Sequence, residues 1–202
     1  MAYFPFFMDL AEKPGLIVGG GKVALRKIEK LLPFGPALTV IALEFCTEIL
    51  EIPGLRLFRR AYAPGDEAGM AFVIAATDQR PLNAMISNRC KVNSIPVNVV
   101  DNAELCTFLF PALVQRGALT VGISTGGSSP TAAICLKEAV SGLLPEHFED
   151  ILDFLHQIRP SLQTRLPCEA DRASVLRSLF FAAMERGRPL TDAETELLLT
   201  EV

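Results

Sequence analysis

The sequence predicts an α/β fold whose parallel sheet is covered by helices on both faces. From about residue 15 to residue 100, short apolar runs without charge alternate with amphipathic stretches. Uncharged strands are typical of a parallel sheet that is buried on both faces. A glycine-rich loop lies between the first strand and the first helix, and only helical patterns follow residue 145. We therefore expect a sheet domain first and a helical tail last.

Hydrophobic periodicity and the positions of proline and glycine place the expected elements. In the sheet region we expect strands at 15–18, 37–42, 55–59, 71–76 and 95–100, and helices at 22–32, 44–50 and 81–90. Two short strands are then expected at 107–110 and 118–124, followed by a helix at 129–144. Prolines separate the last helices, which are expected at 146–158, 170–186 and 192–202. We divide the chain into domains at residues 1–110, 111–144 and 145–202.

Composition limits the functional class. The 202 residues are 50% hydrophobic and 21% charged, which excludes a disordered chain. No uninterrupted apolar run reaches the ~18 residues of a membrane span, and a net charge of −4 argues against a nucleic-acid partner. Residues 1–10 lack the features of a signal peptide, so we expect a cytoplasmic protein. The five cysteines and two histidines are scattered, and we expect neither disulfides nor a metal site.

Residues 16–24, LIVGGGKVA, carry the pattern G-x-G-x-x-A between the first strand and the first helix. Gly19 permits a tight turn, Gly21 lets the backbone approach a pyrophosphate, and Ala24 lets the helix pack closely on the strand. Free N–H groups at the helix N-terminus then face the phosphates. The motif predicts a Rossmann-type domain that binds a dinucleotide. The alternative is a glycine-rich turn without a ligand.

The ends of the second and fourth strands bear on the identity of the dinucleotide. Glu44 follows the second strand and either contacts the adenosine ribose or is a solvated residue in the first turn of a helix. No basic residue follows closely to take a 2′-phosphate, so we expect NAD rather than NADP. After the fourth strand, capping of the next helix is favoured for Asp78. We expect the cofactor to contact Gly19, Gly21, Lys22, Val23, Leu43, Glu44, Ala76 and Thr77.

Asp101 ends the fifth strand, at the edge of the sheet where a Rossmann ligand binds. A carboxylate there can accept a proton while the substrate loses a hydride. The residues alone favour a simpler role, a strand-end turn with Asn102. Asn98 lies three residues earlier, on the opposite face of an alternating strand, and is expected to be structural.

Residues 124–130, STGGSSP, join an apolar strand to a helix, with Ser128 or Ser129 as the N-cap. Loose N–H groups at such a helix start attract anions, so the loop can hold a substrate carboxylate. A well-capped helix without a ligand explains the same pattern. The expected substrate contacts are Ser124, Thr125, Gly126, Gly127 and Ser128.

Four motifs together resemble the precorrin-2 dehydrogenase family, the stand-alone form of the N-terminal half of bacterial siroheme synthase. They are GGGKVALRK at 19–27, AATD at 75–78, NVVD at 98–101 and STGGSSP at 124–130. The chain is also similar to the bifunctional yeast enzyme. The resemblance implies NAD-dependent oxidation of precorrin-2 to sirohydrochlorin with Asp101 as the catalytic base. It also implies a homodimer held by the middle segment, and some family members insert ferrous iron into the product.

One departure and two alternatives accompany this resemblance. The larger siroheme synthase has a phosphorylatable serine at the position of Thr125, which puts regulation by phosphorylation in doubt. The 202 residues contain no methyltransferase-like region, so we expect that fused activity to be absent. A non-catalytic NAD-binding regulatory module would need neither the NVVD motif nor the helical tail. A chelatase would need a base for the pyrrole N–H protons but no fixed metal site.

Overall fold

The computed structural model describes residues 3–200, which form two compact units with separate hydrophobic cores. We call residues 3–110 the sheet unit and residues 111–200 the hairpin–helix unit. The predicted division at residue 144, inside the second unit, stays a prediction. Within residues 3–200, every helix is too short or too polar to cross a membrane.

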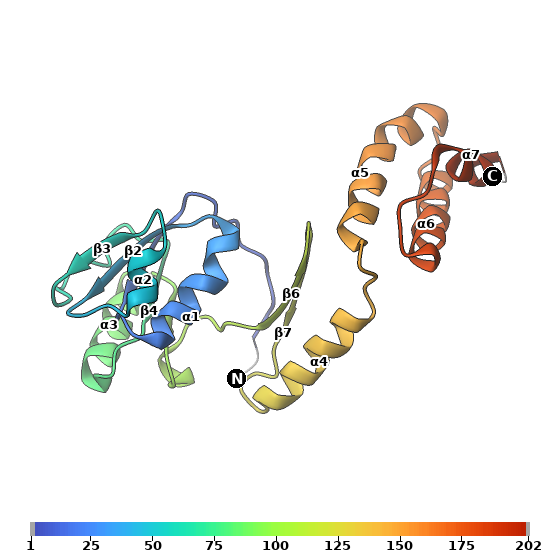
Figure 1. Ribbon diagram of the computed structural model, residues 1–202. Helices are drawn as coiled ribbons and strands as arrows, with labels where there is room; N and C mark the ends of the chain where they lie inside the picture. The colour runs from blue at the N-terminus through green and yellow to red at the C-terminus, as the bar shows by residue number, and fades with distance from the viewer. Residues whose placement is uncertain (1–2, 201–202) are drawn as a thin grey trace. The chain divides into compact units, whose positions relative to one another are not determined.

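A five-stranded parallel sheet forms the centre of the sheet unit (Figure 1). Its strands are β1 (Pro14–Val18), β2 (Ala37–Ala42), β3 (Arg56–Arg59), β4 (Phe72–Ala75) and β5 (Val97–Val99). They lie in the order β3-β2-β1-β4-β5, and all neighbours pair in parallel. This order is that of the Rossmann fold, so the carboxyl ends of all the strands meet at one ligand-binding edge. The predicted α/β fold is confirmed.

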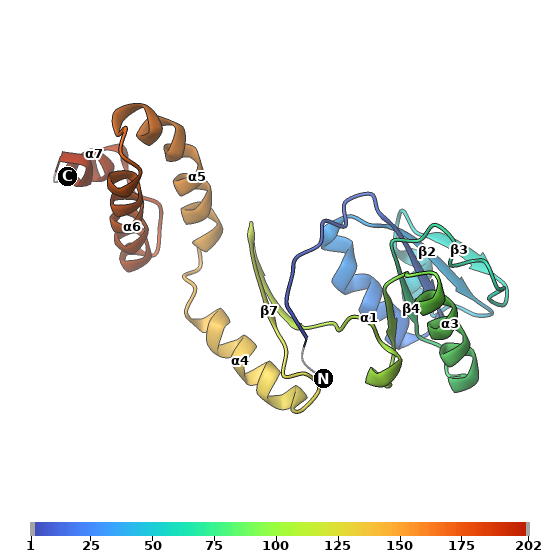
Figure 2. The same ribbon diagram turned by 180° about the vertical axis from the view of Figure 1, so that it is seen from behind.

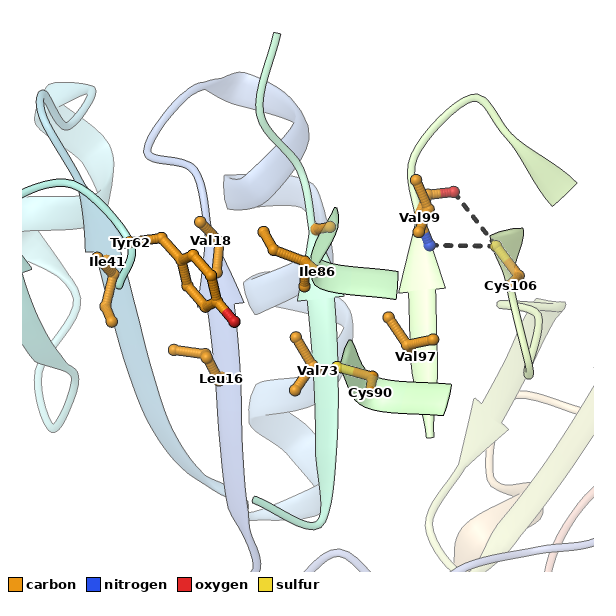
Figure 3. Packing of buried hydrophobic residues seen from close by; sticks show 11 residues of the cluster. Leu16, Val18, Ile41, Tyr62, Val73, Ile86, Cys90, Val97, Val99 and Cys106 are labelled. Carbon is orange, nitrogen blue, oxygen red and sulfur yellow. Dashed lines mark hydrogen bonds between the residues drawn. The ribbon is translucent and has the colours of Figure 1, made fainter. Parts of the chain in front are cut away.

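Helices cover both faces of this sheet. They are α1 (Lys22–Leu31) and α2 (Thr47–Glu51) on one face and α3 (Arg80–Val92) on the other. Ile28 of α1 is fully buried on the first face. On the second face, Ile86 and Cys90 of α3 pack against Leu16 and Val73 (Figure 3). Fully burying a side chain of this size stabilises the fold by about 1.5–3 kcal/mol.

The hairpin–helix unit begins with an antiparallel pair of strands and continues as helices (Figure 2). Its elements are β6 (Ala112–Arg116), β7 (Leu119–Ile123), α4 (Pro130–Gly142), α5 (Phe148–Arg165), α6 (Glu169–Arg186) and α7 (Asp192–Thr200). Helix α4 contacts both strands, and α5 and α6 lie side by side around the buried residues Ile151 and Leu179. Residues 201 and 202 of the last predicted helix lie outside the described residues.

The structure corrects one predicted strand. Residues 107–110 form no strand, and the partner of β7 is β6, a segment that we expected to be a connection. Phe108 and Phe110 instead pack on the α1 face of the sheet, with ring centres 5.6 Å apart. Gly117 has φ +51°, which permits the two-residue turn between β6 and β7.

Two predicted helix boundaries are also wrong. Helix α2 begins at Thr47 rather than at residue 44, because the N–H of Cys46 donates to Gly20 O and holds the preceding loop against the sheet. Helix α5 runs through Pro160, where we expected a break, and ends at Arg165. Burial of α5 on both sides of the proline, against α6, offsets the lost backbone hydrogen bond.

Candidate active site

Three glycines turn the chain from β1 into α1 at the carboxyl edge of the sheet. Gly19 has φ +123°, and a Cβ at this position would collide with Ala76 O. A Cβ at Gly20 would collide with Glu44 O. A Cβ at Gly21 would meet no atom within 4 Å. The fold itself therefore requires the first two glycines, whereas the third borders open space.

The N-terminus of α1 is left without a cap. Gly21 is the N-cap residue, and no side chain of the described part of the chain caps the first turn. The N–H groups of Lys22 and Val23 therefore have no acceptor within the helix, and both residues are exposed. Ala24 is fully buried against the strand, as the motif predicted. Open space at Gly21 beside unpaired N–H groups fits the pyrophosphate of a dinucleotide.

Leu43 and Glu44 follow the carboxyl end of β2, and both side chains are exposed. Because α2 begins later, Glu44 is a loop residue and not a first-turn helix residue. Strand pairing adds a residue that the sequence analysis missed. Arg59, the last residue of β3, lies in register with Ala42 and brings a cation to this edge. Only strand pairing reveals this proximity, because the two residues are distant in the chain.

A hydrogen-bonded pair shapes the loop after β4. The hydroxyl of Thr77 donates to Asn83 Oδ1 at 2.7 Å, and Asn83 Nδ2 donates back to Thr77 O at 2.9 Å. Asn83, which our sequence reasoning did not single out, thus holds Ala76 and Thr77 at the edge. The predicted capping by Asp78 is wrong, because Gln79 is the N-cap of α3 and no side chain among the described residues caps that helix.

Asp101 lies in the turn after β5, at the same edge, with φ +55°. Its exposed carboxylate has no hydrogen-bond or ion-pair partner within residues 3–200. The left-handed conformation is uncommon outside glycine, although aspartate adopts it more readily than most residues. Asn98 is buried, and its Nδ2 donates to Phe108 O at 3.0 Å. The predicted structural role of Asn98 is confirmed.

Side chains of the following segment bond to the edge of β5. The N–H of Val99 donates to Cys106 Sγ at 3.1 Å, and the thiol lies 3.2 Å from Asn102 O (Figure 3 shows its contacts with Val99). The N–H of Val97 donates to Thr107 Oγ1 at 2.7 Å. These bonds take the place of a sixth strand and hold the turn after β5. The sequence analysis missed Cys106, because thiol-to-backbone bonding leaves no motif.

The loop at residues 124–129, here called the serine loop, belongs to the hairpin–helix unit. Thr125 Oγ1 accepts from the N–H of Ser129 at 3.1 Å, and Ser124 Oγ accepts from the N–H of Gly126 at 3.2 Å. Ser129 is the N-cap of α4, and its Oγ accepts from Ala132 N at 3.1 Å. Much of the hydrogen-bonding capacity of the loop is therefore used internally. Substrate contacts by Ser124, Thr125, Gly126, Gly127 and Ser128 stay a prediction.

Comparison with known proteins connects this edge to a cofactor. Residues 6–112 match the family described as "Putative NAD(P)-binding". The chain belongs to this NAD(P)-binding family. The predicted nicotinamide dinucleotide cofactor is thereby confirmed. Among residues 3–200, no group of three His, Cys, Asp or Glu side chains could hold a metal ion.

Siroheme synthases are similar to this chain over most or all of its length. That of Pseudomonas aeruginosa is 38% identical over 208 aligned positions, which cover 100% of this chain and 44% of that protein. That of Methylococcus capsulatus is 38% identical over 170 positions, which cover 83% of this chain and 36% of that protein. The chain thus spans less than half the length of these relatives.

A solved structure shares the whole fold. SirC, a precorrin-2 dehydrogenase, superposes with a TM-score of 0.74 over 98% of both chains at 25% identity. The resemblance inferred from the four sequence motifs is confirmed by these relatives.

Proposed function

We propose that this chain is an NAD-dependent precorrin-2 dehydrogenase, which produces sirohydrochlorin for siroheme synthesis. The observation that carries the proposal is the likeness to a precorrin-2 dehydrogenase over 98% of both chains. The unpartnered carboxylate of Asp101, at the sheet edge that carries the glycine loop, supports it. A cytoplasmic location stays a prediction from the sequence.

The reaction removes one hydride and one proton from the macrocycle. Bound NAD supplies the acceptor for the hydride. Asp101 takes the proton, because its carboxylate is exposed and engaged by no other side chain. After product release, the exposed position lets Asp101 return the proton to water. The products are then sirohydrochlorin, NADH and one proton, which balances the reaction.

Residues at the carboxyl edge of the sheet would contact different parts of the bound dinucleotide. Backbone N–H groups from Gly21, Lys22 and Val23 hold the pyrophosphate, Leu43 and Glu44 lie at the adenosine ribose, and Ala76 and Thr77 lie at the nicotinamide ribose. Gly19 contributes the tight turn that brings the loop to the cofactor, because its own N–H donates to Ile41 O at 2.9 Å. NAD is favoured over NADP because the exposed carboxylate of Glu44 repels a 2′-phosphate. The guanidinium of Arg59, at the neighbouring strand end, would instead attract a 2′-phosphate and so reduce the preference for NAD.

Incubation of the protein with precorrin-2 and NAD tests the proposal. The absorption spectrum should change to that of sirohydrochlorin as NADH accumulates in equal amount. Asp101→Asn is the matched control, because it keeps size and shape but removes the proton acceptor. We expect NAD to bind as before and turnover to fall by ~10²–10⁴. Absence of NADH formation by the wild-type protein would refute the proposed reaction, and normal turnover by the variant would refute the role of Asp101.

The same experiment addresses iron insertion and the regulatory alternative. Addition of ferrous or cobaltous ion after dehydrogenation should give the spectrum of a metallated product if the chain also inserts iron. Here iron is a substrate. A regulatory module would bind NAD without oxidising precorrin-2, and Asp101→Asn would leave its output unchanged.

We further propose that the hairpin–helix unit pairs with a second copy of the chain. A two-stranded sheet is marginal alone, and among residues 3–200 β6 and β7 pair only with each other. The adjoining helix α4 exposes Ile134 and Leu136, each at 53%. Light scattering at micromolar protein should give twice the 21.9 kDa mass of one chain. Leu136→Glu should yield monomers, whereas Val92→Glu, on the sheet unit, should not; a monomeric wild-type protein would refute the pairing.

A further inference from the structure

Lys27 on α1 lies over the ring of Phe110, on the same face of the sheet as Phe108. Its Nζ lies 3.9 Å from the centre of the Phe110 ring, and the side chain is half-buried. Burial, and then repulsion from Lys30, lower the pKa of Lys27, whereas Cys106 and Asp101 raise it. Contacts of Phe110 connect Lys27 to the strand that leads to Asp101, because Phe110 packs on Phe108 and the carbonyl of Phe108 accepts from Asn98 of β5. Lys27 forms no ion pair with any residue from 3 to 200.

Two other cations of the sheet unit are neutralised by carboxylates. Arg89 Nε donates to Glu67 Oε1 at 2.7 Å, and Arg60 pairs with Asp66 at 2.7 Å. Among residues 3–200, the ammonium group of Lys27 contacts only the aromatic face of Phe110. A cation–π contact of this kind stabilises the cation by about 0.5–2 kcal/mol. A cation held partly out of water without an anion costs free energy. The surroundings of Lys27 therefore favour an incoming anion.

The proposed substrate carries anionic groups that would come near Lys27 when its ring lies at Asp101. Precorrin-2 carries several carboxylates around its ring, and proton transfer to Asp101 requires the ring to lie at the turn after β5. A peripheral carboxylate is then within reach of a cation that is near the same turn. We propose that Lys27 binds a peripheral carboxylate of the tetrapyrrole and positions the ring against Asp101. This role rests on the proposed function and is distinct from proton transfer itself.

Titration with sirohydrochlorin in the absence of NAD tests the role directly. Dehydrogenation leaves the peripheral carboxylates intact, so the product serves as a binding probe followed by absorbance. The variants are Lys27→Met, which keeps the aliphatic stem over Phe110, and Lys27→Arg, which keeps the charge. Lys30→Met is the matched control, because Lys30 lies on the same helix and is exposed. Lys27→Gln is made in parallel, so that a poorly folded methionine variant does not prevent the test.

A charge-assisted hydrogen bond contributes enough that Lys27→Met should weaken sirohydrochlorin binding by about 10-fold or more. The KM for precorrin-2 should rise in the same proportion, while the affinity for NAD stays unchanged. Lys27→Arg should retain binding to within about threefold, since its guanidinium also binds carboxylates. Lys30→Met should match the wild-type protein.

The outcomes separate this role from the proposed function. Wild-type binding and KM in both Lys27→Met and Lys27→Gln would overturn the role of Lys27 alone. An equal loss in Lys30→Met would overturn it as well, because the effect would then be general electrostatic attraction. A wild-type protein that neither binds sirohydrochlorin nor oxidises precorrin-2 would refute the proposed function, and the role of Lys27 with it.

Discussion

The loop from β1 to α1 and the loop from β7 to α4 both lead through glycines into a helix. They differ in whether side chains accept hydrogen bonds from the backbone N–H groups at the start of that helix. At α1, Gly21 is the N-cap, and no side chain from residues 3–200 caps the first turn. At α4, Ser129 caps the helix with its own hydroxyl, and Thr125 accepts the N–H of Ser129. The serine loop is hydrogen-bonded within itself, whereas the N–H groups of Lys22 and Val23 at the start of α1 have no acceptor among residues 3–200.

This difference indicates which loop is built to receive a ligand. Donors that side chains already satisfy stabilise the helix, and a ligand would have to replace those bonds. Unpaired donors beside open space can bind an anion without breaking any bond. We therefore infer that the glycine loop is the stronger anion site and that the serine loop first of all stabilises α4. Four substitutions test the comparison.

Gly21→Val should have the largest effect, and the effect should fall on the cofactor. The backbone of Gly21, at φ −91° and ψ −174°, is open to any residue, and a Cβ there meets no atom within 4 Å. The valine side chain would occupy the space of the pyrophosphate. NAD affinity measured by calorimetry should fall about 100-fold, the equivalent of one or two charged hydrogen bonds. Unfolding free energy should change by less than about 0.5 kcal/mol, and a variant that is folded and binds NAD normally would contradict the phosphate site.

Gly19→Ala should act on stability instead. Its φ of +123° disfavours alanine, and the added Cβ would collide with Ala76 O. We expect a loss of about 2–3 kcal/mol in unfolding free energy, measured with urea. Gly127→Ala in the serine loop is the control, because its φ is +89° but a Cβ there meets open space. That control should cost about 1 kcal/mol. Equal losses would mean that the collision with Ala76 does not matter.

Glu44→Gln should change which dinucleotide the glycine loop accepts. Removal of the carboxylate removes the repulsion of a 2′-phosphate, while Arg59 remains at the neighbouring strand end. The ratio of turnover with NADP to turnover with NAD should rise by about 10-fold, or about 1.4 kcal/mol. Glu48→Gln on α2 is the matched control and should leave the ratio unchanged. Equal use of the two dinucleotides by the wild-type protein would make the preference for NAD wrong.

Ser129→Ala should have the smallest effect, and it should fall on the hairpin–helix unit. Loss of the hydrogen bond from Ala132 N to Ser129 Oγ should cost about 1 kcal/mol of unfolding free energy. NAD affinity should stay unchanged, because the serine cap belongs to the other unit. A loss of NAD affinity with unchanged stability would reverse the inferred roles of the two loops.

Much of the sheet unit could be predicted from sequence because its signals are local. Strand β2 has the predicted bounds, 37–42, since an uncharged apolar run between turn residues identifies a buried parallel strand. The region after Asp101 was harder. The segments at 107–110 and 112–114 are both short and mostly apolar, and periodicity cannot separate a strand from an apolar connection of that length.

By itself, the sequence determined the Rossmann-type order of elements, the glycine loop, the family and the position of Asp101 at the end of β5. Each of these depends on residues that are close together in the chain. Only the tertiary structure decided that Asn83 holds the loop after β4, that Arg59 lies level with Ala42, and that Lys27 faces Phe110. These contacts join residues that are adjacent only after strands pair and helices pack. Their chemistry could therefore be recognised from residue type, but their partners could not.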